Sequence, residues 1–128
     1  MSFRHFVQKN FNNHAESRDE HWNKTLQTKY YKTTKDKAME SLISLFERSE
    51  KYNLNAVSKE HGEISVTIKK GKKAFIVATV IMVRPYQTAI DFSVTTESII
   101  PFDFGYSTKV IHHLYELVGR DLQVLDKR

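Results

Sequence analysis

The stretch that most constrains the fold is residues 62–98, where three strand-like runs follow one another. The first run, Glu63–Lys69, alternates apolar and polar side chains, and so does the third, Thr88–Thr95. Successive side chains of a strand point to opposite faces, so both patterns indicate half-buried strands. The middle run, Ala74–Val83, is apolar on both faces, and its β-branched residues favour a strand over a buried helix. The sequence therefore predicts an antiparallel meander whose central strand needs cover on both sides.

Turn signals bound these runs. Gly71 lies inside Lys69–Lys73 and can adopt a positive φ without steric cost, while unpaired lysines stay in solvent. We therefore expect an exposed hairpin tip there. Pro85 cannot donate a hydrogen bond to a strand partner, which predicts a second turn at Arg84–Gln87. Gly62 predicts a tight turn just before the first run.

Helical patterns flank the meander. Thr33 is expected to cap the first helix, with Asp36 placed favourably near the positive end of the helix dipole. Apolar residues then recur at helical spacing as far as Phe46. A second helix is expected over Tyr106–Val118, and Gly119 suits the left-handed residue that often follows a helix.

The complete set of elements predicts the fold class. Further strands are expected at Leu26–Lys32 and Leu54–Lys59, and residues 121–128 either add a short strand or fray. The resulting order is β-α-β-β-β-β-α. It predicts an α+β, two-layer domain over residues 25–128, in which an antiparallel sheet of about five strands carries two helices on one face.

Residues 1–24 are expected to form an N-terminal arm or a short helix. This segment holds the large aromatic residues Phe3, Phe6, Phe11 and Trp22. These side chains are too many to leave in solvent. We therefore expect the segment to pack on the domain or on a second subunit.

Length and composition limit the function classes. A chain of 128 residues is the size of one domain. It carries 20 basic and 15 acidic residues, and the net charge of +5 can attract anions, nucleic acid or acidic lipid. Without cysteine there are no disulfides, thiol nucleophiles or thiolate metal sites, which suits a reducing cytosol. No apolar run is long enough to span a membrane and no secretory signal is evident, so we predict a cytoplasmic location.

Two resemblances can be stated. The element order resembles one half of a TATA-box-binding protein and, more loosely, a helix-grip ligand-binding domain; order alone implies a fold and no function. The passage from strand to helix through Thr33 and Thr34, and the Asp103-Phe104-Gly105 segment before the last helix, are similar to small uncharacterised cytosolic proteins of Gram-positive bacteria. That similarity implies a bacterial origin and names no activity.

The two faces of the meander predict where the protein interacts. The helices are expected to cover the face that includes Ile64 and Phe92, which leaves one row of the central strand without cover. We therefore predict a non-catalytic binding or assembly module that uses this second face for self-association or for an apolar ligand. The residues predicted for self-association are Ile76, Ala78, Val80 and Met82 from this row, with Phe6 and Trp22 from the N-terminal segment.

Nucleic-acid binding is an alternative hypothesis. A sheet edge that mixes lysines with an aromatic residue can contact phosphates and unpaired bases. Acidic residues on the same face argue against it, and lysines at a strand end also protect against aggregation. The residues predicted for anion or nucleic-acid contact are Lys29, Tyr31, Lys69, Lys70, Lys72 and Lys73.

An enzyme is the remaining alternative. Asp91 could act as a general acid or base beside Glu63 or Ser93. No Gly-x-Ser-x-Gly, Walker or dinucleotide-binding motif is present, so no catalytic residue and no cofactor is predicted. The 6 histidines predict no metal site, because the adjacent His112 and His113 point in different directions on a helix; His113 is expected nearer the buried side.

Overall fold

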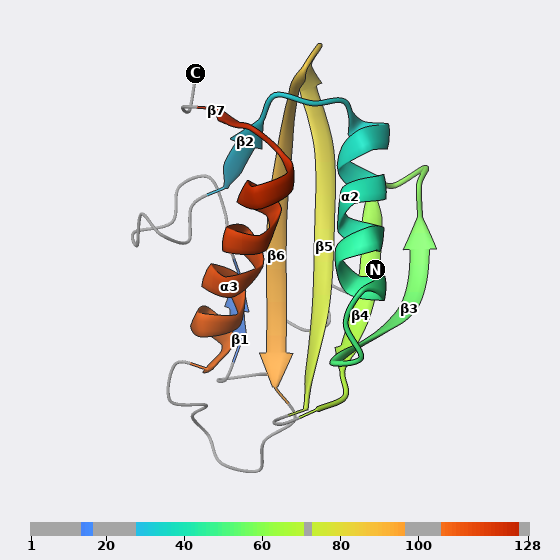
Figure 1. Ribbon diagram of the computed structural model, residues 1–128, viewed down its shortest axis with the longest axis vertical. Helices are drawn as coiled ribbons and strands as arrows, with labels where there is room; N and C mark the ends of the chain where they lie inside the picture. The colour runs from blue at the N-terminus through green and yellow to red at the C-terminus, as the bar shows by residue number, and fades with distance from the viewer. Residues whose placement is uncertain (1–13, 17–27, 71–72, 97–105, 126–128) are drawn as a thin grey trace.

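The protein folds as an antiparallel sheet with both helices packed on one face, as the computed structural model shows (Figure 1). The predicted two-layer α+β architecture is thus confirmed. The structure describes residues 14–16, 28–70, 73–96 and 106–125. The elements are β1 (His14–Glu16), β2 (Lys29–Tyr31), α2 (Lys35–Glu47), β3 (Tyr52–Ser58), β4 (Glu63–Ile68), β5 (Ala74–Arg84), β6 (Gln87–Thr96), α3 (Tyr106–Asp121) and β7 (Val124–Leu125).

The strands are ordered β3-β4-β5-β6-β2-β7 across the sheet. The predicted meander therefore forms, extended by β3 at its outer edge. Both β1 and β2 pair with β6, β2 at residues 88–90 and β1 at residues 93–95. His14–Glu16 belongs to the segment predicted as an arm or short helix, and it forms a strand instead because the free edge of β6 offers it backbone partners. Phe6 and Trp22 lie outside the described residues.

The helix ends differ by a residue or more from the prediction. Thr34, and not Thr33, caps α2: its side-chain oxygen accepts a hydrogen bond from the Lys37 amide at 3.2 Å. The carbonyl of Thr33 instead accepts from the Thr88 hydroxyl at 2.6 Å, which ties the start of α2 to β6. Gly119 does not end α3 in a left-handed conformation, since the helix continues to Asp121.

The core lies between the helices and one face of β4, β5 and β6. Residues directly opposite in antiparallel strands point to the same side. Ile76 is opposite Val66 on β4 and Val94 on β6, so these three side chains form one buried row beneath the helices. The face predicted for this row of β5 is therefore wrong. Ile76, Ala78 and Val80 face the helices, whereas Phe75, Val77, Thr79 and Ile81 occupy the opposite face.

Two core tyrosines should respond in opposite ways to loss of the hydroxyl. Tyr31 is fully buried and its hydroxyl has no hydrogen-bond partner in the described part of the chain; burial raises its pKa. The Tyr115 hydroxyl donates to the Ile90 carbonyl at 2.9 Å. Tyr31→Phe should raise the free energy of unfolding by about 1 kcal/mol, and Tyr115→Phe should lower it by about 1 kcal/mol. Urea unfolding, monitored by far-ultraviolet circular dichroism, measures both changes in the free energy of unfolding. A loss of stability in Tyr31→Phe would show that the Tyr31 hydroxyl does have a hydrogen-bond partner.

Candidate functional site

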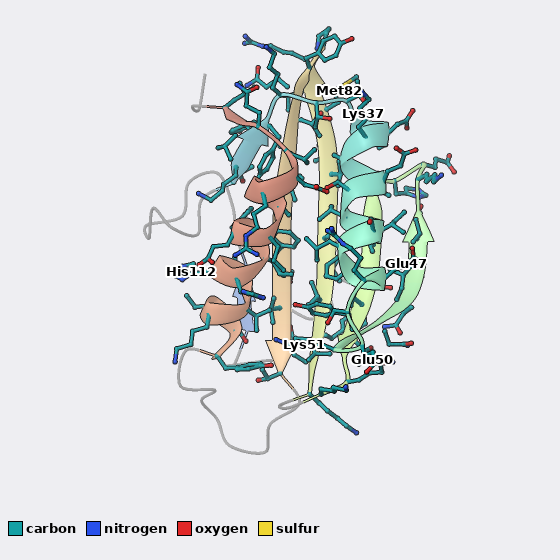
Figure 2. All side chains as sticks on the ribbon, in the orientation of Figure 1. Lys37, Glu47, Glu50, Lys51, Met82 and His112 are labelled. Carbon is teal, nitrogen blue, oxygen red and sulfur yellow. The ribbon has the colours of Figure 1, made fainter. Side chains whose placement is uncertain are left out.

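The most exposed apolar surface of the described residues is the end of the β5–β6 hairpin. The exposed fractions are 53% for Ile81, 46% for Met82, 49% for Val83 and 64% for Tyr86. We call these four residues the hairpin end. Figure 1 shows β5 and β6 extending past the neighbouring elements, and Met82 is labelled at this end of the sheet in Figure 2. Contiguous apolar residues that remain in solvent mark a contact surface more often than isolated ones do.

The exposure follows from the unequal lengths of the strands. β5 has 11 residues, whereas its neighbour β4 has 6 and pairs only with Ala74–Thr79. A hydrogen bond from the Val80 amide to the Gly62 carbonyl, at 2.7 Å, closes this side of β5. Beyond Val80, β5 pairs only with β6 among the described strands. An apolar strand segment with one free edge is therefore presented to solvent.

The turn at the hairpin end is strained. Arg84 pairs with Gln87, after a register shift between Met82 and Arg84, and Tyr86 has a φ of 59°. A bulky residue other than glycine rarely adopts a positive φ, at a cost of order 1 kcal/mol. Such strain is found more often at functional positions than elsewhere, and here it holds an aromatic side chain in solvent. The sequence predicted this turn but gave no sign of the strain.

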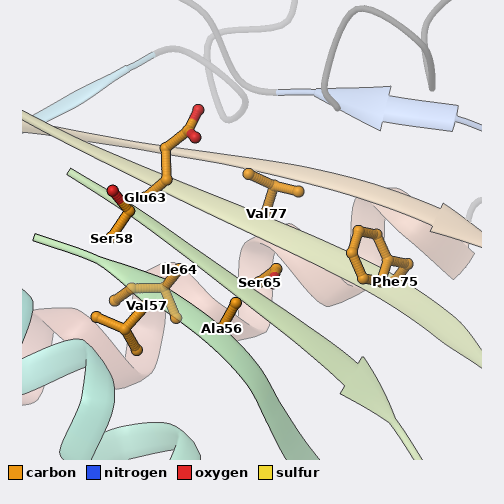
Figure 3. Close-up of a pocket in the computed structure, with 8 residues that line it drawn as sticks. All are labelled: Ala56, Val57, Ser58, Glu63, Ile64, Ser65, Phe75 and Val77. Carbon is orange, nitrogen blue, oxygen red and sulfur yellow. The ribbon is translucent and has the colours of Figure 1, made fainter. Parts of the chain in front are cut away.

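A shallow hollow lies on the face away from the helices, at the β3 edge. Figure 3 shows Glu63 and Val77 projecting from this face, while the helices lie behind the opposite one. The hollow has a volume of about 270 Å³ and is associated with a register shift in β3 between Leu54 and Ala56. This volume is below the roughly 300–1,000 Å³ of ordinary ligand sites. The hollow is lined by Ala56, Val57, Ser58, Glu63, Ile64, Ser65, Phe75 and Val77.

Of the described residues that were predicted for self-association, only Met82 is found at the surface. Ile76, Ala78 and Val80 are buried in the core beneath the helices, where no partner can reach them. Phe6 and Trp22 are outside the described residues. The exposed apolar residues therefore lie at the hairpin end and not along the row that the sequence predicted.

The residues predicted for nucleic-acid contact do not share one surface. Tyr31 is buried, and the Lys29 ammonium lies 5.3 Å from the centre of the Tyr115 ring, on the helix side. Lys70, beyond the end of β4, forms an ion pair with Glu50 at 3.1 Å. Because β5 and β6 separate β2 from β4, Lys29 is about 15 Å from the β4 edge. Lys69 and Lys73 flank the β4–β5 turn, and Lys72 lies outside the described residues.

Asp91 has a structural partner. Its carboxylate accepts a hydrogen bond from the Thr28 hydroxyl at 2.6 Å, which joins β6 to the residue before β2. Glu63 and Asp91 are both opposite Thr79, on the face away from the helices. Two strand spacings separate the backbones of the two acids by about 10 Å. Ser93 is buried on the same strand.

The histidines on α3 are arranged differently from the prediction. His113 is exposed and His112 is half-buried, because the buried side of α3 is centred on Ile111 and Leu114. His61 interacts with the Ser58 hydroxyl through its Nδ1 atom at 2.8 Å. Within the described ranges, no group of three or more His, Cys, Asp or Glu residues could hold a metal ion.

Comparisons with known proteins identify no relative. No protein-family model matches the chain, and neither the curated proteins nor the solved structures include a match. The resemblances stated for the sequence therefore remain predictions. In the part of the chain that the structure describes, neither helix has the length and apolar character needed to cross a membrane.

Proposed function

We propose that the protein is a small non-catalytic assembly module that binds a second copy of itself through the hairpin end. The observation that carries this proposal is the exposure of three consecutive aliphatic side chains, Ile81, Met82 and Val83, beside the exposed ring of Tyr86. Removing such side chains from water is the main favourable contribution to most protein association.

The free edge of β5 beyond Val80 can bind a second copy of this chain. An unpaired strand edge can bind the same edge of another chain in antiparallel orientation, which is the self-complementary contact of a two-fold dimer. Centred on Met82, such pairing places Met82 opposite Met82 of the second chain and Ile81 opposite Val83. The two arginines then do not face each other, and the apolar side chains at the centre become buried.

The oligomeric state of matched variants tests this proposal. We expect the wild-type protein to sediment as a dimer across a concentration series, and Val83→Lys to sediment as a monomer, because it brings charge into the apolar contact. Val124→Lys is the matched control: Val124 has an exposed fraction of 50%, close to the 49% of Val83, but lies on β7. We expect it to remain a dimer. Circular dichroism checks that all three proteins are folded.

Two outcomes would overturn the proposal. One is a wild-type protein that remains monomeric at every concentration. The other is a Val83→Lys variant that dimerises as tightly as the Val124→Lys control. The predicted cytoplasmic location and bacterial origin are compatible with the proposal and remain predictions, as do the nucleic-acid and enzyme alternatives.

A further inference from the structure

A second cavity, unrelated to the hairpin end, lies between α2 and α3. The two helices run antiparallel on the sheet (Figure 1). The cavity has a volume of about 330 Å³, within the lower range of sites for small molecules. Leu45 from α2, Leu117 from α3 and Tyr52 from β3 provide its apolar lining. We call this cavity the inter-helix groove.

The inter-helix groove has an excess of positive charge. Arg48 follows the last residue of α2, Lys51 lies in the next turn (labelled in Figure 2), and Arg120 is in the last turn of α3. Within the described residues, none of these three cations forms an ion pair. The groove also contains one carboxylate, Asp121, which accepts a hydrogen bond from the Ser41 hydroxyl at 2.7 Å. The Lys51 ammonium lies 5.7 Å from the centre of the Tyr52 ring, which does not neutralise its charge. The three cations around the cavity therefore leave a local field that attracts an anion.

Tyr52 is the aromatic residue that lines the groove. The exposed fraction of Tyr52 is only 6%, and its hydroxyl has no hydrogen-bond partner among the described residues. Its ring packs edge-on against Phe46 with 5.2 Å between ring centres, which limits reorientation. Burial is the main cause of a raised pKa for Tyr52, and the nearby Tyr106 raises the pKa further, so the hydroxyl stays protonated. The hydroxyl oxygen has essentially no exposed surface, so a ligand in the groove does not reach it.

We propose that the inter-helix groove binds a phosphorylated small molecule of about mononucleotide size. Arg48, Lys51 and Arg120 would neutralise the phosphate, since arginine suits the bidentate recognition of phosphate oxygens. The apolar part of the ligand would contact Leu45 and Leu117, which line the groove. This site does not depend on self-association through the hairpin end.

Calorimetric titration of the full chain tests the site with three probes: inorganic phosphate, adenosine monophosphate and a single-stranded oligothymidylate. We expect adenosine monophosphate to bind with saturation and more tightly than inorganic phosphate. Arg48→Gln and Arg120→Gln should each weaken this binding roughly tenfold, the usual effect of losing one hydrogen bond to a charged group. Lys37→Gln is the matched control, because Lys37 is an exposed cation on α2 that does not line the groove; its affinity should be unchanged.

Tyr52→Phe is a second control. The variant keeps the ring and removes only a hydroxyl that the ligand does not reach, so neither the thermal midpoint nor the affinity for adenosine monophosphate should fall. Unchanged affinity in both arginine variants would overturn the proposal, as would the absence of binding by all three probes. Binding of the oligothymidylate alone, with a steep dependence on salt, would also overturn it and would assign the groove to nucleic acid.

Discussion

Val80→Asp should unfold the protein, whereas the same substitution at the neighbouring Ile81 should leave it folded. Val80 is buried beneath the helices, and Ile81 points to the other face with an exposed fraction of 53%. An unpaired carboxylate at Val80 should cost about 4 kcal/mol or more, which is close to the whole stability of many small domains. At Ile81 the carboxylate remains in water, and the expected loss is about 1 kcal/mol or less.

Far-ultraviolet circular dichroism and urea unfolding of the two variants measure this difference. The pair also tests the face assignment of β5, since the two residues are adjacent and both are aliphatic. A folded Val80→Asp variant would mean that the row containing Ile76 and Ala78 lies on the uncovered face, as the sequence pattern suggested. If the hairpin end mediates self-association, the folded Ile81→Asp variant should also dimerise less tightly than the wild-type protein.

Gly62→Ala should be the second severe substitution. Gly62 has a φ of +68°, and a β-carbon placed on it would lie 2.2 Å from the Val80 carbonyl oxygen. That oxygen belongs to the backbone of the central strand and cannot move without disturbing the strand pairing. The positive φ and the steric overlap each cost of order 1–3 kcal/mol, so we expect a loss of roughly 3–5 kcal/mol in the free energy of unfolding.

Gly119→Ala is the matched control and should have the opposite sign. Gly119 is inside α3, and the nearest atom to an added β-carbon is a methyl carbon of Val124 at 3.9 Å, an ordinary contact distance. Alanine in a helix interior is more stable than glycine by about 0.5–1 kcal/mol, so the variant should gain stability. A loss of stability in Gly119→Ala would instead indicate a left-handed helix end at this residue. Urea unfolding of the two glycine variants measures both effects.

Most elements could be predicted from local patterns, because each pattern lies within the element that it describes. The alternation in Glu63–Lys69 predicted β4, which runs from Glu63 to Ile68. The apolar run Ala74–Val83 predicted β5, which extends one residue further. β1 was missed because three residues are too few for a periodic signal, and only the edge of β6 makes them a strand.

The two candidate sites were much less accessible to sequence reasoning. Met82 was predicted at an interaction surface, but for a row whose other members are buried. The exposure of the hairpin end depends on β4 being shorter than β5, which is a relation between two strands. The inter-helix groove forms because Arg48, just after α2, and Arg120, in α3, are brought together by the antiparallel packing of the two helices. No local sequence pattern in one helix indicates which residues of the other helix lie beside it.

The fold class, the meander and the positions of the helices could all be predicted from the amino-acid pattern, because the periodicity of apolar residues decides which local conformation can bury them. The row of β5 that faces the helices could be assigned only from the folded arrangement of the strands. Both rows of that strand are apolar, so burial energy alone does not choose between them. The choice is made by the pairing of β5 with β4 and β6, which places Ile76 beside Val66 and Val94 beneath the helices.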